Sequence, residues 1–593
     1  MDHQYDIAII GSGISGAMLA SILAKNQLRV ILIDAGTHPR FAVGESMVPE
    51  SAVLLEMLAL RYGIPELAYP GNIANINKHI GTSAAGVKLA FAFAWNGRGQ
   101  EQDPSQVVST PVLAPEAHLF RQDVDAYYVA LAARLGASVR QMAPIREMEF
   151  FDDGAVLHVG EGEQIKVRYV VDAAGYRSPL AALLGLRDGA RPMQANTRSI
   201  FTHMVGVKTY EDVVATPPIS GTPTHLGQST LHHMFDCGWL WIIPFDNHPF
   251  STNPLCSVGL QFDIGKHGPA TSDPEGEFQR FIAQYPSIAR HFEGAARVRE
   301  WTVAPRLNYT SRATTGDRYC LLGHAVGFVD PLFSRGLVNT FESITRLVPV
   351  LLRAATEDRW QREDFLSLER YSLDVVRIND RLVANSYTAF TSFPLWNAWF
   401  RIWLSGSYIG VLRLRKLLSE YKATCDGDAL DRSFEQASFS GHLSIESPHF
   451  EAMFDAACTA MESFAAGTLG RDETIKTLHQ LYADNRAHLP LDFSDFSNRY
   501  LSRPTQEFAK SLLDWANHAP AGLAQKLQRG TQVAPVEFLD AYRWGDRLGL
   551  AAMADGARAC GGATSVITSM PAPTEANVVG PDARSTHGNR AAS

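Results

Sequence analysis

The sequence predicts a mixed α/β (α+β) fold, in which a nucleotide-binding module with an interleaved second sheet is followed by a largely helical C-terminal region. Three observations support this class. A strand, a glycine-rich turn, a helix and a second strand open the chain, short strands alternate with turns through the middle, and mainly helical patterns follow from about residue 350. We expect the module over residues 1–350 and the helical region, completing a substrate pocket, over 351–558. Residues 559–593 are rich in Gly, Ala, Ser, Thr and Pro, which predicts a disordered tail.

Composition restricts the function classes. The 593 residues are 46% hydrophobic and 19% charged, which is typical of a large globular protein. With 53 Lys and Arg against 62 Asp and Glu, the net charge of −9 offers no basic excess for nucleic acid. The six cysteines form no CxxC pair, so neither a disulfide scaffold nor a metal site is indicated. There is no signal-peptide pattern and no apolar run of about 18 residues, so we expect a cytoplasmic protein without a membrane span.

The first element is a nucleotide-binding βαβ unit. Residues 5–10 form a short apolar strand, residues 11–16 read Gly-Ser-Gly-Ile-Ser-Gly, residues 17–24 form a buried helix, and residues 30–33 form a second apolar strand that ends at Asp34. The alternative is a glycine turn that has only a packing role and binds no ligand. That alternative does not explain why an acidic residue stands at the end of the second strand. The unit therefore predicts a dinucleotide site.

Each position of this turn has a physical reason. Gly11 permits the tight turn, Gly13 lets the backbone approach a diphosphate, and Gly16 lets the helix pack on the strand. Free N–H groups of the helix start face the diphosphate. Asp34 accepts hydrogen bonds from ribose hydroxyls, so an adenine dinucleotide without a 2′-phosphate is expected. The cofactor-binding residues predicted here are Gly11, Ser12, Gly13, Ser15, Gly16 and Asp34.

Strand and turn segments then lead to the helical region. Residues 167–171 have the composition of a strand, and they run into a small-residue turn at 172–175 beside the expected nucleotide site. A second turn region over 316–325 precedes the segment 327–337, and we expect a helix over 338–353.

One stretch of the helical region is strongly aromatic. Between residues 387 and 403 the aromatic residues recur at three- and four-residue spacings, and Pro394 is expected to break or kink the helix. Core packing is the favoured interpretation, and a pocket wall or an interface is the alternative. The aromatic residues are Phe390, Phe393, Trp396, Trp399, Phe400 and Trp403.

Four short segments together carry a family resemblance. Residues 44–49 read Gly-Glu-Ser-Met-Val-Pro, 121–125 read Arg-Gln-Asp-Val-Asp, 172–175 read Asp-Ala-Ala-Gly, and 239–244 read Trp-Leu-Trp-Ile-Ile-Pro. In this order, the four segments resemble the GES-x-x-P turn, the Arg-x-x-x-Asp helix start, the Asp-Ala-x-Gly strand end and the W-x-W-x-I-P signature of the flavin-dependent halogenases. Residues 239–244 match the W-x-W-x-I-P signature without a mismatch. The resemblance implies a glutathione-reductase-like module that binds FAD.

The resemblance also assigns roles to particular residues. It implies that Trp239, Trp241 and Pro244 form a wall near the flavin that keeps the enzyme from acting as a monooxygenase. The alternative is a buried strand, because alternate tryptophans share one face. The implied cofactor contacts are Glu45, Ser46, Arg121, Asp330 and Leu337, and the implied chloride site is formed by backbone N–H groups of Arg335 and Gly336.

Lys88 is the candidate catalytic residue. It lies in the apolar segment 86–95 and is followed by Phe93 and Trp95, which is similar to the lysine motif of halogenases. A lysine in an apolar segment is costly unless it has a partner or a task. The alternative is a lysine that extends to solvent. Lys78, the nearest competitor, lacks the aromatic spacing.

The resemblance extends from residue 1 to at least Phe400, and it is strongest to the pyrrolnitrin-pathway branch of the family. Two departures stand out. His324 replaces the acid of a common Gly-Asp-Ala motif, so Asp330 or Asp317 would contact the cofactor instead. Phe333 stands where tryptophan halogenases have a glutamate base, which favours an electron-rich pyrrole, phenol or aniline over tryptophan.

Resemblance to this family implies a specific reaction. FADH2 from a separate flavin reductase reacts with O2, chloride or bromide is oxidised to hypohalous acid, and Lys88 directs halogenation of the aromatic ring of a natural-product intermediate, as in antibiotic biosynthesis. The sequence has no second glycine-rich motif, so direct binding of NAD(P)H is not indicated. The alternatives are an FAD-dependent monooxygenase or reductase of the same fold, or a non-enzymatic prenyl-lipid escort. Whether the small aromatic substrate is free or carrier-tethered stays open.

Overall fold

The computed structural model describes residues 3–81, 84–187, 189–214, 225–236, 238–435, 447–500 and 514–527. They lie within one compact unit, Met1–Ala554. The tail predicted over 559–593 lies outside the described residues. The boundary at residue 350 stays a prediction, and helix α10 (Arg335–Glu357) runs through it.

The first sheet contains the predicted βαβ unit. β1 (Tyr5–Ile10) pairs in parallel with β2 (Val30–Ile33) and with β8 (Glu163–Asp172), so the glycine turn and the end of β8 meet at one edge. The strand predicted over 167–171 is the second half of β8. The strand order is β15-β16-β8-β1-β2-β5, with β6 and β7 joined through β8. The other strands are β5 (Ser138–Arg140), β6 (Ile145–Phe151), β7 (Gly154–Val159), β15 (Thr315–Gly316) and β16 (Tyr319–Leu321).

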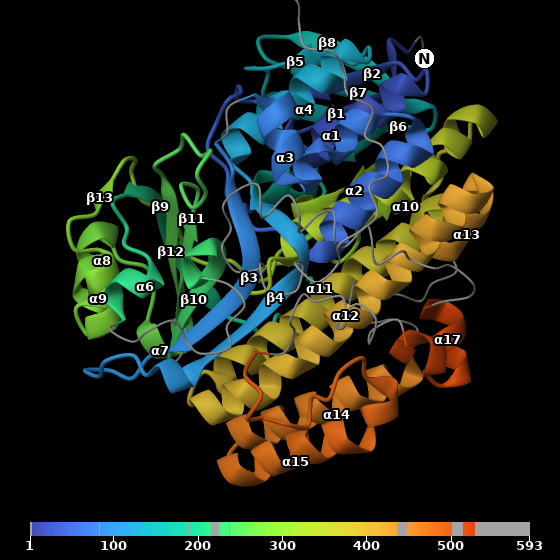
Figure 1. Cartoon of the computed structure of the whole chain (residues 1–593). Coiled ribbons are helices and arrows are strands. Elements are labelled where there is room, and N and C mark those ends of the chain that lie inside the picture. Colours follow the sequence, from blue (N-terminus) through green and yellow to red (C-terminus); the bar gives the residue numbers. More distant parts are fainter. Residues whose placement is uncertain are drawn as a thin grey trace, which may run out of the picture. The chain divides into compact units, whose positions relative to one another are not determined.

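Helices cover this sheet and connect it to the rest of the unit. α1 (Ile14–Lys25) packs against α4 (Arg121–Arg134) and α10, and α2 (Pro49–Tyr62) packs against α10 and against a long helix of the C-terminal region (Figure 1). The helix predicted over 338–353 is confirmed as α10, which begins three residues earlier. Three short helices are α3 (Ile73–Asn75), α5 (Pro179–Leu183) and α7 (Ile264–His267).

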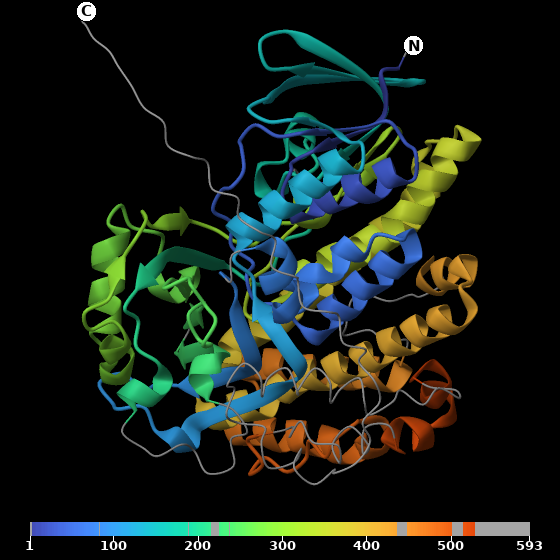
Figure 2. The same cartoon turned by 45° about the horizontal axis from the view of Figure 1, so that its top comes forward.

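The second sheet is the interleaved one. Its order is β13-β9-β12-β11-β10-β3-β4, with β14 on β9, and all its pairs are antiparallel except β10 with β3. β3 (Gly86–Trp95) and β4 (Val107–His118), blue in Figure 2, enter this sheet from between α2 and α4 in the sequence. The remaining strands are β9 (Thr197–Val205), β10 (Ser229–Phe235), β11 (Gly238–Pro244), β12 (Cys256–Asp263), β13 (Ala296–Arg297) and β14 (Thr302–Ala304).

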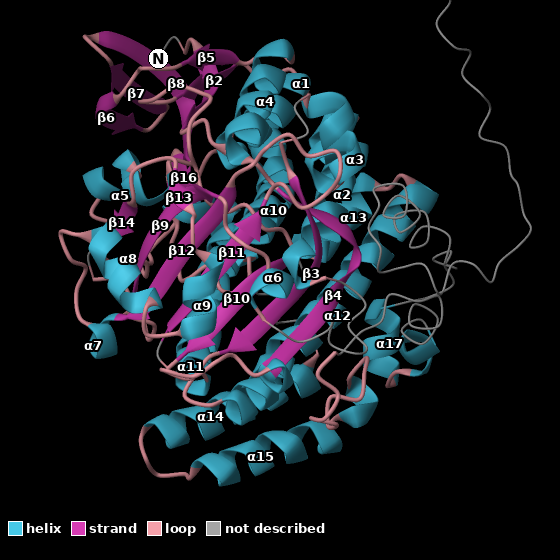
Figure 3. Cartoon of the chain, turned by 60° about the vertical axis from the view of Figure 1, so that its left-hand side comes forward, coloured by secondary structure: helices cyan, strands magenta, loops and turns pink. Residues whose placement is uncertain are grey.

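The two faces of this sheet have different partners. α6 (Tyr210–Val213), α8 (Pro274–Ile282) and α9 (Pro286–His291) share a smaller apolar core with one face (Figure 3). Because side chains alternate along a strand, Leu240 and Ile242 of β11 join that core, whereas Trp239 and Trp241 join the main core. The tryptophan face is therefore the face that meets the helical region.

Helices make up most of the described residues after 351, and the domain predicted over 351–558 stays a prediction. α11 (Leu366–Ala389) and α12 (Phe393–Thr424) pack against each other, and α14 and α15 lie beyond them (Figure 1). The expected break occurs, with Pro394 in the first turn of α12, where proline is tolerated. Trp396, Trp399 and Trp403 are buried, as core packing predicts. The other helices are α13 (Gly427–Glu435), α14 (Pro448–Ala465), α15 (Arg471–Asp484) and α17 (Ala521–Leu527).

Candidate active site

The glycine turn after β1 has the form of a diphosphate cradle. Gly11 has a φ of +95°, and a Cβ there would lie 2.7 Å from Ala174 Cα, whereas a Cβ on Gly16 would lie 1.9 Å from Gly11 O. A Cβ on Gly13 would meet Asp125 Oδ2 at 3.9 Å and nothing closer. Two glycines are thus required by packing, and the third faces open space at the start of α1. This arrangement fits a bound dinucleotide.

Asp34 stands at the end of β2 as predicted, but it already has protein partners. Its carboxylate accepts hydrogen bonds from Ser12 N (2.6 Å), Gly36 N (2.7 Å) and both terminal nitrogens of Arg40 (2.5 and 2.7 Å). Burial would raise the pKa of Asp34, but the hydrogen bonds from Arg40, Ser12 and Gly36 hold it well below its usual value. A ribose bound here must share this carboxylate with Arg40 or displace the arginine.

Arg121 fixes the loop that carries the GES-x-x-P turn. Its Nε and NH2 donate to both oxygens of Asp125 at 2.8 Å, and its NH1 donates to Val43 O (2.7 Å) and Gly44 O (3.2 Å). Arg121 and Asp125 are both buried. Such a two-pronged charged contact is geometrically specific. Because Asp125 also approaches Gly13, α4 and its loop border the diphosphate cradle.

Glu45 and Ser46 join the module to the second sheet. Glu45 Oε1 lies 2.8 Å from His203 Nε2, and Leu119 N donates to Glu45 O at 2.7 Å. Ser46 Oγ lies 2.8 Å from Thr230 Oγ1 on β10. Both residues therefore lie at the junction between the module and the second sheet, and their contact with the cofactor stays a prediction.

The tryptophan motif lies on a buried strand, and its role as a wall near the flavin stays a prediction. Trp239 and Trp241 share one face of β11, with ring centroids 5.7 Å apart. Trp239 Nε1 donates to Tyr387 Oη (3.2 Å), and Tyr387 donates to Asp330 Oδ2 (2.9 Å). Pro244 ends the strand. α11 thus fixes the orientation of Trp239, a contact that the sequence did not reveal.

Asp330 and Asp317 lie in different surroundings. Asp330 is buried and accepts hydrogen bonds from Tyr387, from Leu332 N (3.0 Å) and from Thr197 Oγ1 (3.2 Å); burial raises its pKa to about 6, against these hydrogen bonds. Its role as a cofactor contact stays a prediction. Asp317 precedes β16, at the end opposite to the glycine turn, and accepts from Arg362 N at 2.9 Å. This position gives no support to the alternative that Asp317 contacts the cofactor.

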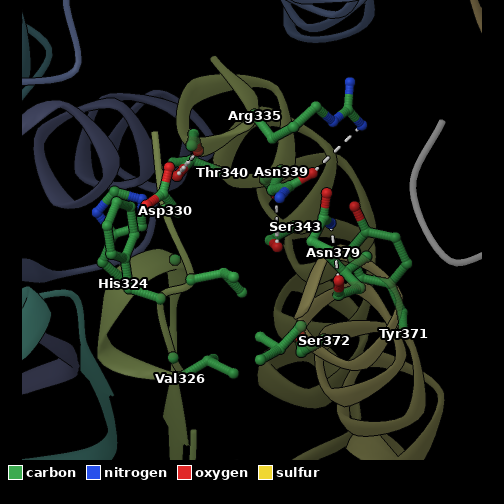
Figure 4. Close-up of a pocket in the computed structure, with 17 residues that line it drawn as sticks. His324, Val326, Asp330, Arg335, Asn339, Thr340, Ser343, Tyr371, Ser372 and Asn379 are labelled. Carbon is green, nitrogen blue, oxygen red and sulfur yellow. Dashed lines mark hydrogen bonds between the residues drawn. The ribbon is translucent and has the colours of Figure 1, made fainter. Parts of the chain in front are cut away.

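The predicted chloride loop lies at the start of α10. Ser334, with a left-handed φ of +52°, precedes the first helical residue, Arg335. The N–H groups of a first helical turn have no acceptor within the helix, so Arg335 and Gly336 suit an anion. They line a hollow that is partly open to solvent, and His324 lies directly beside Gly336, where a Cβ would be 2.8 Å from His324 Nε2 (Figure 4). Leu337 is buried in the core beside them.

Lys88 is completely buried on β3. Its Nζ donates to Met47 O, lies 3.1 Å from Glu116 Oε2, and stands 3.5 Å from the centroid of the Phe91 ring. Burial lowers the pKa of Lys88 to about 8, against the opposing effect of Glu116. The lysine thus has specific partners and does not extend to solvent, which contradicts the alternative interpretation.

Aromatic rings connect the tryptophan wall to Lys88. Trp239 packs on His232 (centroids 5.2 Å apart), His232 on Phe93 (4.5 Å), Phe93 on Phe91 (6.3 Å), and Phe91 on Trp403 of α12 (5.1 Å). Phe91 is also the ring beneath Nζ. A continuous row of packed rings from the second sheet and the helical region therefore lies between Trp239 and Lys88.

A cavity adjoins Phe91 on the side of α12. It is a small hollow that is partly open to solvent. The ladder between β3 and β4 is irregular here, because the partner changes from Glu116 at Lys88 to Pro111 at Ala90. The lining residues are Pro49, Phe91, Thr110, Val112, Trp403, Leu404, Ser407, Tyr408 and Val411.

Comparisons with known proteins agree with this geometry. Residues 4–347 match the model of the FAD binding domain family. Tetracycline 7-halogenase of Kitasatospora aureofaciens is 40% identical over 90% of this chain and 98% of its own length. Monodechloroaminopyrrolnitrin halogenase PrnC of Pseudomonas fluorescens is 38% identical over 81% of this chain and 84% of its own. The chain belongs to the flavin-dependent halogenases. The crystal structure of the halogenase PltM with phloroglucinol and FAD is 46% identical, with a TM-score of 0.82 over 84% of this chain and all of that one.

Membership of the halogenase family decides between the halogenase, monooxygenase and reductase functions that the sequence left open. This halogenase binds FAD and is an enzyme that halogenates an aromatic ring; the monooxygenase or reductase alternative has no support from its relatives. Within the described residues, no helix is long and apolar enough to span a membrane, and no cluster of His, Cys, Asp or Glu suits a metal ion.

Proposed function

We propose that this halogenase holds halide and FAD at the start of α10 and transfers the oxidised halogen to the substrate through Lys88. When bound and reduced, FAD would supply the two electrons that reduce O2 to the peroxide level, the oxidant that converts chloride or bromide to hypohalous acid. The backbone N–H groups of Arg335 and Gly336 hold the halide, because unpaired N–H groups at a helix start bind anions. Trp239 and Trp241 keep the substrate ring away from the flavin, so that ring hydroxylation does not compete.

The observation that carries this proposal is a completely buried lysine whose Nζ lies against Phe91, at one end of a row of packed rings that reaches Trp239. Lys88 acts in one of two ways: Nζ–H donates a hydrogen bond to hypohalous acid, or the neutral amine attacks its halogen, forming N–X and releasing water. In the second case the ring then forms its C–X bond and passes its proton to Nζ. Burial favours the neutral amine that this route requires.

We propose that the cavity beside Phe91 holds an electron-rich ring of the pyrrole, phenol or aniline type. Phe333, which is buried and stacks on Trp403 (centroids 4.9 Å apart), supplies no base, so the ring must lose its proton readily. Thr110 and Ser407 place hydroxyl groups in the lining, which suits a ring that carries hydroxyl or amino groups. The relatives act on or bind rings of this kind: one is named for tetracycline, and PltM was crystallised with phloroglucinol.

We also propose that a separate flavin reductase supplies FADH2 in the cytoplasm. The sequence has one glycine-rich dinucleotide turn and no second one for a nicotinamide cofactor. Purified enzyme with FAD, O2, halide and NADH should therefore form no halogenated product until a reductase, or chemically reduced FAD, is added. Product formation measured by mass spectrometry with NADH alone would show that the chain reduces its own flavin.

A further inference from the structure

Glu116 is a buried acidic residue directly opposite Lys88. The two residues are cross-strand partners in the β3–β4 ladder, and Glu116 is 3% exposed. Glu116 Oε2 lies 3.1 Å from Lys88 Nζ, and neither carboxylate oxygen has a hydrogen bond of good geometry. A buried charge is costly unless a nearby group of opposite charge neutralises it. The Glu116 carboxylate and the Lys88 ammonium group therefore stabilise each other in the buried site.

A second acid near Lys88 has its own partners. Glu50 of α2 is also buried, but its Oε1 accepts a hydrogen bond from Ser407 Oγ (2.9 Å) and lies 3.5 Å from Arg335 NH1. Arg335 therefore provides the positive charge that compensates the Glu50 carboxylate. Glu50 acts on Lys88 only as a weaker, more distant charge than Glu116.

Two histidines also face Lys88, one on β4 and one on β10. Burial lowers the pKa of His118 and of His232 to about 3. Both are therefore neutral at the pH values at which enzymes of this kind work. Within the described residues around Lys88, Glu116 is the carboxylate whose charge is coupled most directly to Nζ.

We infer that Glu116 is a positioning residue that sets the charge of Lys88 for halogen transfer, an inference that rests on the proposed function. The step is the movement of one proton. An N–H bond of Nζ breaks, an O–H bond forms on Glu116 Oε2, and the electron pair stays on nitrogen. The pair has zero net charge before and after, so this transfer leaves no net charge in the buried site.

The surroundings bring the pKa values of the two groups close together and near neutral pH. Burial lowers the pKa of Lys88 to about 8 and raises the pKa of Glu116 to about 7, while each partner's charge opposes both effects. Lys88 can therefore donate a hydrogen bond as an ammonium group or attack as an amine. Without the carboxylate, burial would hold the pKa of Lys88 lower, and the ammonium form would be lost at neutral pH.

The test is Glu116→Gln, which keeps the side-chain volume and removes the charge. We expect the pH profile of halogenated product per FADH2 oxidised, measured from about pH 6 to about pH 9, to move its Lys88-dependent limb to lower pH by about one unit or more. An acid limb that moves indicates the amine route, and an alkaline limb that moves indicates the ammonium route. Glu116→Asp keeps the charge, so its limb should stay near that of the wild type.

The matched control is Glu277→Gln, which removes an acid paired with buried Arg198 (2.6 Å) on the far face of the second sheet. It should leave the limb in place. A second readout needs neither flavin nor turnover. Infrared difference spectra of the apoprotein over the same pH range should contain a protonated-carboxyl band that Glu116→Gln removes and Glu277→Gln retains.

Several outcomes would overturn the inference. If Glu116→Gln is inactive or fails to fold, Lys88→Met tests the pairing instead. Loss of the ammonium group should shift the pH at which the Glu116 carboxyl band appears to a higher value. A band that does not shift contradicts the pairing. An unmoved activity limb in folded Glu116→Gln contradicts the inference as well. These results differ from a failure of the proposed function, which would instead appear as full halogenation by Lys88→Met.

Discussion

Lys88→Ala is expected to lose halogenated product while flavin oxidation continues. In the proposed function Nζ holds or accepts the halogen, and the proposed halide and flavin sites lie on elements other than β3. Residues that move protons or form covalent intermediates contribute about a hundredfold to ten-thousandfold. We expect a loss of at least a hundredfold in product per FADH2 oxidised, measured by mass spectrometry alongside O2 consumption.

Controls separate chemistry from folding. Lys78→Ala removes the competing lysine, which is exposed near the same strand, and should keep product formation near the wild-type level. Lys88→Ala leaves Glu116 buried without its partner, which costs about 3 to 5 kcal/mol in comparable pairs. The double variant Lys88→Met with Glu116→Gln removes both charges and should recover stability without recovering product. Full halogenation by any folded Lys88 variant would exclude the proposed role.

Gly16→Ala is expected to disrupt the module itself. The added Cβ would lie 1.9 Å from Gly11 O, a backbone atom at the tightest point of the turn, so α1 must move away from β1. Overpacking of this kind costs about 1 to 3 kcal/mol, and more when backbone must shift. We expect a variant with clearly lowered unfolding midpoint in denaturant and no measurable FAD binding by fluorescence titration.

Gly13→Ala is the matched comparison. Its Cβ would meet no atom closer than 3.9 Å, so the protein should fold with near wild-type stability. The same methyl group would occupy the space through which the backbone approaches the diphosphate, so FAD affinity should fall. Equal FAD binding by Gly13→Ala and the wild type would show that the diphosphate lies elsewhere.

The parts that sequence predicted well depend on local pattern. The βαβ unit from Tyr5 to Asp34 follows from a strict order of short-range signals, and the shared face of Trp239 and Trp241 follows from strand alternation. The buried lysine was recognised because a charge stands in an apolar strand. In each case the information lies within about 30 neighbouring residues.

The parts that sequence missed depend on contacts between distant segments. Glu116 was not singled out, because its importance comes from pairing with Lys88 across a ladder interrupted at the proline-containing part of β4. Tyr387 carries no local pattern that predicts its role, although it links Trp239 to Asp330 from α11. Arg40, which occupies the carboxylate of Asp34, carried no motif that predicts this pairing.

The most direct measurement of the central claim is product analysis with the purified wild-type enzyme. FAD, a flavin reductase, NADH and O2 are supplied with a panel of pyrroles, phenols and anilines, in chloride, in bromide or without halide. The account predicts product whose mass gain depends on the halide present and that is absent without halide. Hydroxylated product that forms equally with and without halide would contradict it.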